Sequence, residues 1–127
     1  MPKIANIVIN DGTKDITLQP VNIDREGVAH FREKDVSILE AIRLTVQLRQ
    51  PSVNGNVYRC KAKLVVPVVE VVGNVRTTVR TLTETTEVLF TQDSLGTERQ
   101  RVANLTKSLA GHATLMSVVQ DASPIYG

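Results

Sequence analysis

The sequence predicts an α+β fold, in which an antiparallel sheet is followed by two helices. Two observations lead to this class. Apolar and polar residues alternate with a period of two through residues 41–49 and 57–66, a pattern typical of strands with one apolar and one polar face. From Ser94 onward the apolar residues recur at helical spacing instead. Strand patterns come first and helical patterns last, without alternation, so parallel βαβ units are not expected.

The first residues predict an N-terminal hairpin over residues 3–19. Lys3–Asn10 has the alternation of a strand, the following Asp-Gly pair indicates a tight turn, and Asp15–Gln19 forms the returning strand. Pro20 is expected to end that strand. After a polar loop, Gly27–Phe31 is predicted to be a further short strand, followed by a charged turn.

The centre of the chain predicts a second hairpin with a basic face. Strands over Ile42–Gln50 and Val57–Val66 are joined by a short segment that contains an Asn-Gly turn signal. Antiparallel pairing of the two strands would place their polar side chains on one open surface. Because like charges repel, this surface predicts an anionic partner for its five cations: Arg43, Arg49, Arg59, Lys61 and Lys63.

The rest of the predicted sheet, which spans residues 27–91, contains an unusual valine-rich segment. We expect Pro67–Val75 to be a loop around Gly73, and an exposed loop with so many valines would favour aggregation. Two explanations are open: the segment continues the strand, or another subunit covers it. Arg76–Thr91 is predicted to be the last strand, in which Thr83 and Thr85 share one face with Glu87.

Two helices are predicted over residues 94–121. Asp93 or Ser94 is expected to cap the first helix, Gly111 to end it, and Ala113–Gln120 to form the second. Two short helices are too small to cover a broad sheet whose core has two Phe, two Tyr and no Trp to fill it. We therefore expect a homodimer in which the helices of each subunit lie across the sheet of its partner.

Composition and the absence of known motifs exclude several classes of protein. A chain of 127 residues with 42% hydrophobic residues suits one folded domain over 1–127, and no apolar run approaches the ~20 residues of a membrane helix. The sequence begins directly in a strand pattern, without a signal-peptide core. His30 and His112 lack metal-site spacing, and no nucleophile, paired-carboxylate or phosphate-loop motif is present. We expect no enzyme activity, metal, cofactor, membrane partner or small-molecule substrate.

The chain resembles the coat proteins of single-stranded RNA bacteriophages, the levivirus-like family. The resemblance covers nearly the whole length and depends on the order and spacing of several segments. They are Ile16–Pro20 with Gly27–Ala29, Thr45–Gln50 with Tyr58–Lys61, Lys63–Val69, Val79–Thr81, Leu105–Leu109 and the chain end at Ile125-Tyr126. The resemblance implies an N-terminal hairpin, a five-stranded antiparallel sheet and two C-terminal helices that interlock in a homodimer.

The resemblance also implies a function. Dimers would assemble into an icosahedral capsid, T=3 in type, around the single-stranded RNA genome in the cytoplasm of a bacterial host, and the protein would remain in the virion. The inner sheet face would bind an operator stem-loop and repress translation of the replicase. The valine-rich segment would form contacts between dimers around the symmetry axes, without disulfides, through Val68, Val69, Glu70, Val71, Val72, Gly73, Asn74 and Val75.

The family's RNA contacts carry over residue by residue. Thr45 matches a residue of an adenine pocket, Lys61 a basic residue beside it, and Val28 an apolar residue against an unpaired base. Arg43 and Arg49 match phosphate-contacting residues. The remaining predicted RNA-binding residues are Gln47, Arg59, Lys63, Thr83 and Thr85. Near the two threonines some members place a base-stacking tyrosine and an asparagine, which this chain lacks, so a different operator hairpin is expected.

A second function stays open: a cellular RNA- or single-stranded-DNA-binding module that uses an open basic sheet without assembling. Such modules usually stack bases on exposed aromatic side chains. The polar face of the central strands offers none, and Tyr58 has the parity of the apolar face. This pattern favours the coat protein.

Overall fold

The computed structural model describes residues 4–125, which form two compact units, one through Leu89 and one from Phe90. Within the described residues there are six strands and two helices. The strands are β1 (Ile7–Asn10), β2 (Asp15–Ile23), β3 (Ala29–Glu33), β4 (Arg43–Arg49), β5 (Val57–Val72) and β6 (Val75–Thr91). The helices are α1 (Gly96–Ala110) and α2 (Ala113–Asp121), both in the second unit.

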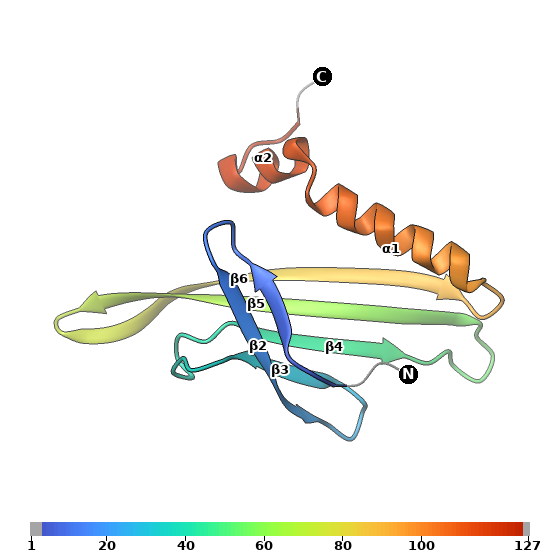
Figure 1. The fold of residues 1–127 in the computed structure, drawn as a ribbon, viewed down its shortest axis with the longest axis horizontal. Helices are drawn as coiled ribbons and strands as arrows, with labels where there is room; N and C mark the ends of the chain where they lie inside the picture. Colours follow the sequence, from blue (N-terminus) through green and yellow to red (C-terminus); the bar gives the residue numbers. More distant parts are fainter. Residues whose placement is uncertain (1–3, 126–127) are drawn as a thin grey trace. The chain divides into compact units, whose positions relative to one another are not determined.

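The strands form one antiparallel sheet in the order β1-β2-β3-β4-β5-β6, so every strand lies beside its neighbour in sequence (Figure 1). The α+β class, the N-terminal hairpin and the two C-terminal helices are confirmed. The sheet differs in detail from the prediction. The sheet has six strands rather than the five that the resemblance implies, because the N-terminal hairpin belongs to the same sheet.

The predicted end of β2 at Pro20 is wrong. Pro20 is paired with Phe31 in β3, and β2 continues to Ile23 after a register shift between Pro20 and Asn22. A bulge leaves one residue out of the ladder and lets the strand resume, so a proline can be accommodated beside it. The charged turn predicted after Phe31 also begins too early, because Arg32 is still paired within the sheet.

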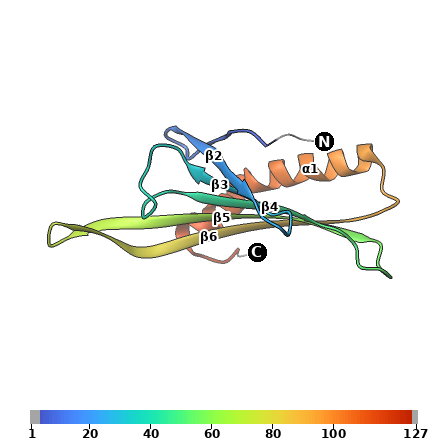
Figure 2. The same ribbon diagram turned by 90° about the horizontal axis from the view of Figure 1, so that it is seen from below.

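The predicted loop over Pro67–Val75 is also wrong, and the alternative, a continued strand, is correct. β5 extends to Val72, and the chain reverses in a two-residue turn at Gly73 (φ 57°) and Asn74 (φ 70°). Positive φ at both central residues matches the turn type that best fits the twist of a hairpin. The β5–β6 hairpin therefore extends well past the ends of β3 and β4, as Figures 1 and 2 show.

The core of the first unit is small and lies under the N-terminal hairpin. Ile16, Leu18 and Phe31 are buried, and Leu18 has no exposed surface. Partly buried residues of β1, β4 and β5 pack against them, including Leu44 and Leu64, which are opposite each other in the ladder. Opposite residues of an antiparallel pair point to the same side, so these side chains define the apolar face of the sheet.

The first helix begins slightly later than predicted, whereas α2 begins at Ala113 as predicted. Leu95 is the N-cap of α1, and its backbone N–H donates to Glu98 Oε1 at 2.7 Å. The expected cap Ser94 instead donates its hydroxyl to the Thr91 carbonyl at 2.7 Å. Gly111 ends α1 as predicted. Neither helix has a buried residue.

Candidate nucleic-acid interface

The register of β4 and β5 gathers the predicted cations on one side. Thr45 is opposite Lys63, Gln47 opposite Lys61, and Arg49 opposite Arg59. Paired residues of an antiparallel ladder share a face, and this face is the reverse of the one that carries Leu44 and Leu64. We call it the basic face and define it by Arg43, Thr45, Gln47, Arg49, Arg59, Lys61 and Lys63. The separation of charged and apolar side chains is confirmed.

One acidic residue neutralises part of the basic face. Arg59 Nη1 lies 3.3 Å from Glu87 Oε1, and both side chains are partly exposed. Across residues 4–125, by contrast, Arg43, Arg49, Lys61 and Lys63 form no ion pair. These four side chains therefore keep their charge available for an external anion, since nothing in the described chain compensates it.

Two hollows divide the residues predicted to share a base pocket. Lys61 lines a hollow of about 160 Å³ together with Gln47, Arg49, Arg59 and Glu87. Thr45 lines a cleft of about 550 Å³ that also includes Arg43 and Lys63. Thr45 and Lys61 thus lie on one face, in ladder pairs separated by one intervening pair, but they line different hollows.

The other predicted contacts lie at the margins. Thr83 and Thr85 are exposed on β6 and alternate with the same period as Glu87, so the three side chains lie on the same face of the strand. Because Glu87 contacts Arg59, this face of β6 is on the same side of the sheet as the basic face. Val28 is half-buried just before β3 and lines neither hollow.

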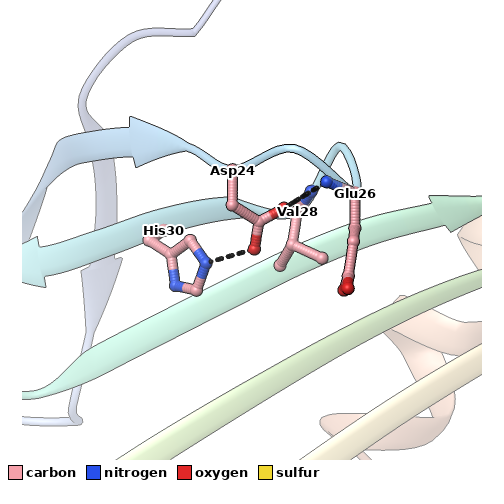
Figure 3. Close-up of polar contacts among 4 residues, drawn as sticks. All are labelled: Asp24, Glu26, Val28 and His30. Atoms are coloured by element: carbon pink, nitrogen blue, oxygen red, sulfur yellow. Dashed lines mark hydrogen bonds and ion pairs between the residues drawn. The ribbon is translucent and has the colours of Figure 1, made fainter.

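Sequence reasoning did not find a polar cluster at the start of β3, shown in Figure 3. Asp24 Oδ2 lies 3.0 Å from His30 Nε2, while its Oδ1 accepts from the backbone N–H of Val28 at 3.0 Å and of Glu26 at 2.9 Å. These contacts, led by the one with His30, lower the pKa of Asp24 below its ordinary value. The only advance signal was an aspartate three residues before Gly27, which has φ 81°.

Residues 4–125 contain no group of three or more His, Cys, Asp or Glu side chains placed to hold a metal ion. Over the same residues, neither helix has both the length and the apolar character needed to cross a membrane.

Comparison with known proteins identifies the family. The model of the levivirus coat protein family matches residues 2–126. The chain belongs to the levivirus coat protein family. It is therefore a structural protein of a viral capsid and a component of the virion. No curated protein matches the chain.

Solved structures support the same fold. The chain is similar to the subunit of a virus-like particle of bacteriophage ESE058, with a TM-score of 0.85 and 18% identity over 98% of this chain and 100% of that one. It is similar to the capsid protein of bacteriophage GA, with a TM-score of 0.73 and 22% identity over 97% and 98%. An unassembled coat protein dimer, described as a bacteriophage RNA-binding dimer, has a TM-score of 0.65 and 19% identity over 97% and 98%.

Proposed function

We propose that this levivirus coat protein forms homodimers that assemble into a T=3 icosahedral capsid around single-stranded RNA, and that its basic face binds an RNA operator hairpin. Binding at the start of the replicase gene would repress translation of the replicase. Assembly would take place in the cytoplasm of the bacterial host. The observation that carries the RNA part is the alignment of Arg43, Arg49, Lys61 and Lys63 on one side of the sheet, where they form no ion pair within residues 4–125.

RNA fits this face because of its charge and its shape. Phosphates neutralise cations and release counterions, which supplies affinity without sequence preference. Unpaired bases in a hairpin loop can enter hollows between side chains, and the hollows that contain Thr45 and Lys61 offer such sites. Val28, Gln47, Arg59, Thr83 and Thr85 complete the proposed contact surface, in the positions described above.

The homodimer is supported by the apolar residues that the single chain leaves exposed. On the helices these include Leu105 (58% exposed), Leu109 (63%) and Val119 (77%). A partner subunit would remove this surface from water, at about 25 cal/mol for each Å² of apolar area. One of the matching structures is itself a coat protein dimer, which supports the same arrangement.

The tip of the β5–β6 hairpin is proposed as the contact between dimers. Val71, Val72 and Val75 are each about 60% exposed beside the turn. Residues 68–75 would pack against the same hairpin of neighbouring dimers around the symmetry axes. The segment contains no cysteine, so these contacts would not involve disulfides.

The RNA proposal is tested by filter binding of the full-length protein to an RNA hairpin with a looped-out adenine. Lys61→Ala is expected to lower affinity about fivefold at 0.1 M salt, the effect of one lost phosphate contact. Thr45→Ala is expected to lower it as well, with dimers still folded. The control Lys107→Ala removes an equal charge from α1 and should have no effect. Unchanged binding curves for both sheet variants would contradict the proposed interface.

Assembly is tested separately by electron microscopy of the expressed protein. Uniform closed particles are expected. Their absence, with RNA binding retained, would favour a non-assembling nucleic-acid-binding module instead.

A further inference from the structure

The distal part of the β5–β6 hairpin extends beyond the rest of the sheet. β4 begins with Arg43 opposite Val65, whereas β5 continues to Val72, so roughly 20 Å of hairpin lies past β4 (Figure 1). A two-stranded ribbon has little stability of its own in water. The proposed contact between dimers is at the end of this ribbon, so its geometry depends on what holds the ribbon in place.

The β3–β4 loop contacts the ribbon at two consecutive residues. The Thr78 hydroxyl donates to the Leu39 carbonyl at 3.4 Å, and the Arg76 guanidinium donates to the Glu40 carboxylate in an ion pair. Residues two apart in a strand share a face, so both contacts are made to the same face of β6. Thr78 is the one partly buried residue between residues 75 and 85, as expected where the loop covers the strand.

The loop itself is held firmly at its base. Ala41 is fully buried, and the backbone N–H groups of Glu40 and Ala41 both donate to the Ser37 carbonyl, at 3.0 and 2.9 Å. The Glu33 N–H donates to the Ile42 carbonyl at 2.8 Å, and the Ile42 N–H donates to Glu33 Oε1 at 3.2 Å. The carboxylate of Glu40 is therefore presented to the ribbon from a fixed backbone.

We propose that the β3–β4 loop is a brace for the distal hairpin, with Glu40 and Thr78 as positioning residues that fix the direction of the hairpin before dimers meet. The brace presents the exposed Val71, Val72 and Val75 to the next dimer in one orientation. Contact between preordered surfaces costs less conformational entropy than contact between mobile ones. The inference rests on the proposed role of the hairpin tip in assembly, and it adds the loop that controls the tip.

The first test is hydrogen–deuterium exchange of the full-length protein, kept unassembled at low concentration. Glu40→Gln keeps the size of the side chain and removes the charge of a partly exposed ion pair. It should raise amide exchange about threefold both in the hairpin, residues 66–80, and in the loop, residues 35–42. The matched control Glu70→Gln removes an equal charge and breaks the pair between Glu70 Oε1 and Arg80 Nη2, 2.9 Å apart within the hairpin. Exchange in the loop should then stay at the wild-type rate.

The second test separates positioning from a general contribution to stability. Glu40→Gln and Thr78→Val should leave the urea midpoint unchanged, because the ribbon lies outside the buried core. Both should slow particle formation, followed by light scattering, at least threefold. Glu40→Arg alone places two cations together and should slow it further. Glu40→Arg combined with Arg76→Glu restores an ion pair and should return the rate toward that of the wild-type protein.

The outcomes separate this inference from the proposed function. Unchanged hairpin exchange in Glu40→Gln overturns the brace, and so does a double charge reversal that fails to restore the assembly rate. Faster exchange with an unchanged assembly rate overturns the role of the loop in assembly. If the wild-type protein forms no particles, the proposed capsid function fails, while the exchange experiment still decides whether the loop holds the hairpin.

Discussion

Removal of one negative charge from the basic face should strengthen RNA binding. Glu87 is the acidic partner of Arg59, with 3.3 Å between Oε1 and Nη1. A phosphate that approaches Arg59 must displace this carboxylate and is repelled by it. Glu87→Gln keeps the size of the side chain and its hydrogen-bonding oxygen while it removes both effects. Arg59 would then join Arg43, Arg49, Lys61 and Lys63 as a free cation.

The magnitude follows from counterion release. Each phosphate neutralised on a single strand adds about 0.7 to the slope of log affinity against log salt, so four free cations predict a slope of about −2.8. Glu87→Gln should steepen it by about 0.7, which corresponds to about fivefold tighter binding at 0.1 M salt. The same substitution in an Arg59→Gln background should add almost nothing, because the cation it releases is absent.

The measurement is a salt titration of anisotropy with a labelled single-stranded RNA. The matched control is Glu70→Gln, which makes the same change in net charge and also releases an arginine, since Arg80 Nη2 lies 2.9 Å from Glu70 Oε1. Glu70 has the opposite strand parity to Arg59 and lies near the hairpin tip, so its removal should leave the slope unchanged. Equal steepening by both variants would refute a localised binding face and indicate a net-charge effect.

Three other predictions concern stability and assembly. Leu18→Ala should lower the free energy of unfolding by about 3 kcal/mol, because truncation of a fully buried leucine leaves a cavity. Urea denaturation measures this effect, with Val8→Ala on the exposed side of the same hairpin as the control. Equal effects of the two substitutions would contradict the assigned core. Deletion of Val71–Asn74 should permit dimers, seen by size-exclusion chromatography, but prevent closed shells; normal particles in electron micrographs would rule out the proposed tip contact. The pKa of Asp24, lowered from 3.8 by its hydrogen bond with His30, predicts stability that is present above pH 3.8 and lost as pH falls through the folded-state pKa. Asp24→Asn should remove that part of the acid dependence of the urea midpoint, and identical pH profiles for the two proteins would argue against it.

The faces of the central strands could be predicted from the sequence because two constraints agree there. Alternation assigns each side chain to a face, and the seven-residue connection between β4 and β5 is short enough for the two strands to pair as neighbours. A slip of one residue would expose Leu44 and Leu64 and bury Lys63. The local alternation of residues is therefore sufficient to predict which side chains form the basic face.

The β2 strand and the distal hairpin were harder to predict because tertiary context overrides the local signals. Pro20 normally ends a strand, but a bulge beside it restores pairing. Gly73-Asn74 indicates a turn, but the pair alone does not distinguish a two-residue hairpin turn from the middle of a longer loop. The valines on both sides favour the hairpin, because their β-branched side chains favour extended backbone.

The His30 cluster could not be predicted at all from residue spacing. Its parts are six residues apart, on either side of a turn, and no period connects them. The cleft also depends on Ile38 and Val65, which belong to a loop and to a strand that is not adjacent to β3. Only the folded sheet, with its bulge at β2 and the loop before β4, brings these side chains around one space.

The proposed RNA binding and the proposed assembly support each other physically. A closed shell would bring the basic faces of many subunits to its inner surface, and their mutual repulsion would oppose closure. Enclosed RNA would neutralise Arg43, Arg49, Lys61 and Lys63 and offset that repulsion. Contact between the apolar hairpin tips would instead remove exposed valine surface from water whether or not RNA is present. The Arg59–Glu87 pair limits the repulsion within each subunit. The same basic face that would recognise an operator in the free dimer would thus make shell closure depend on RNA.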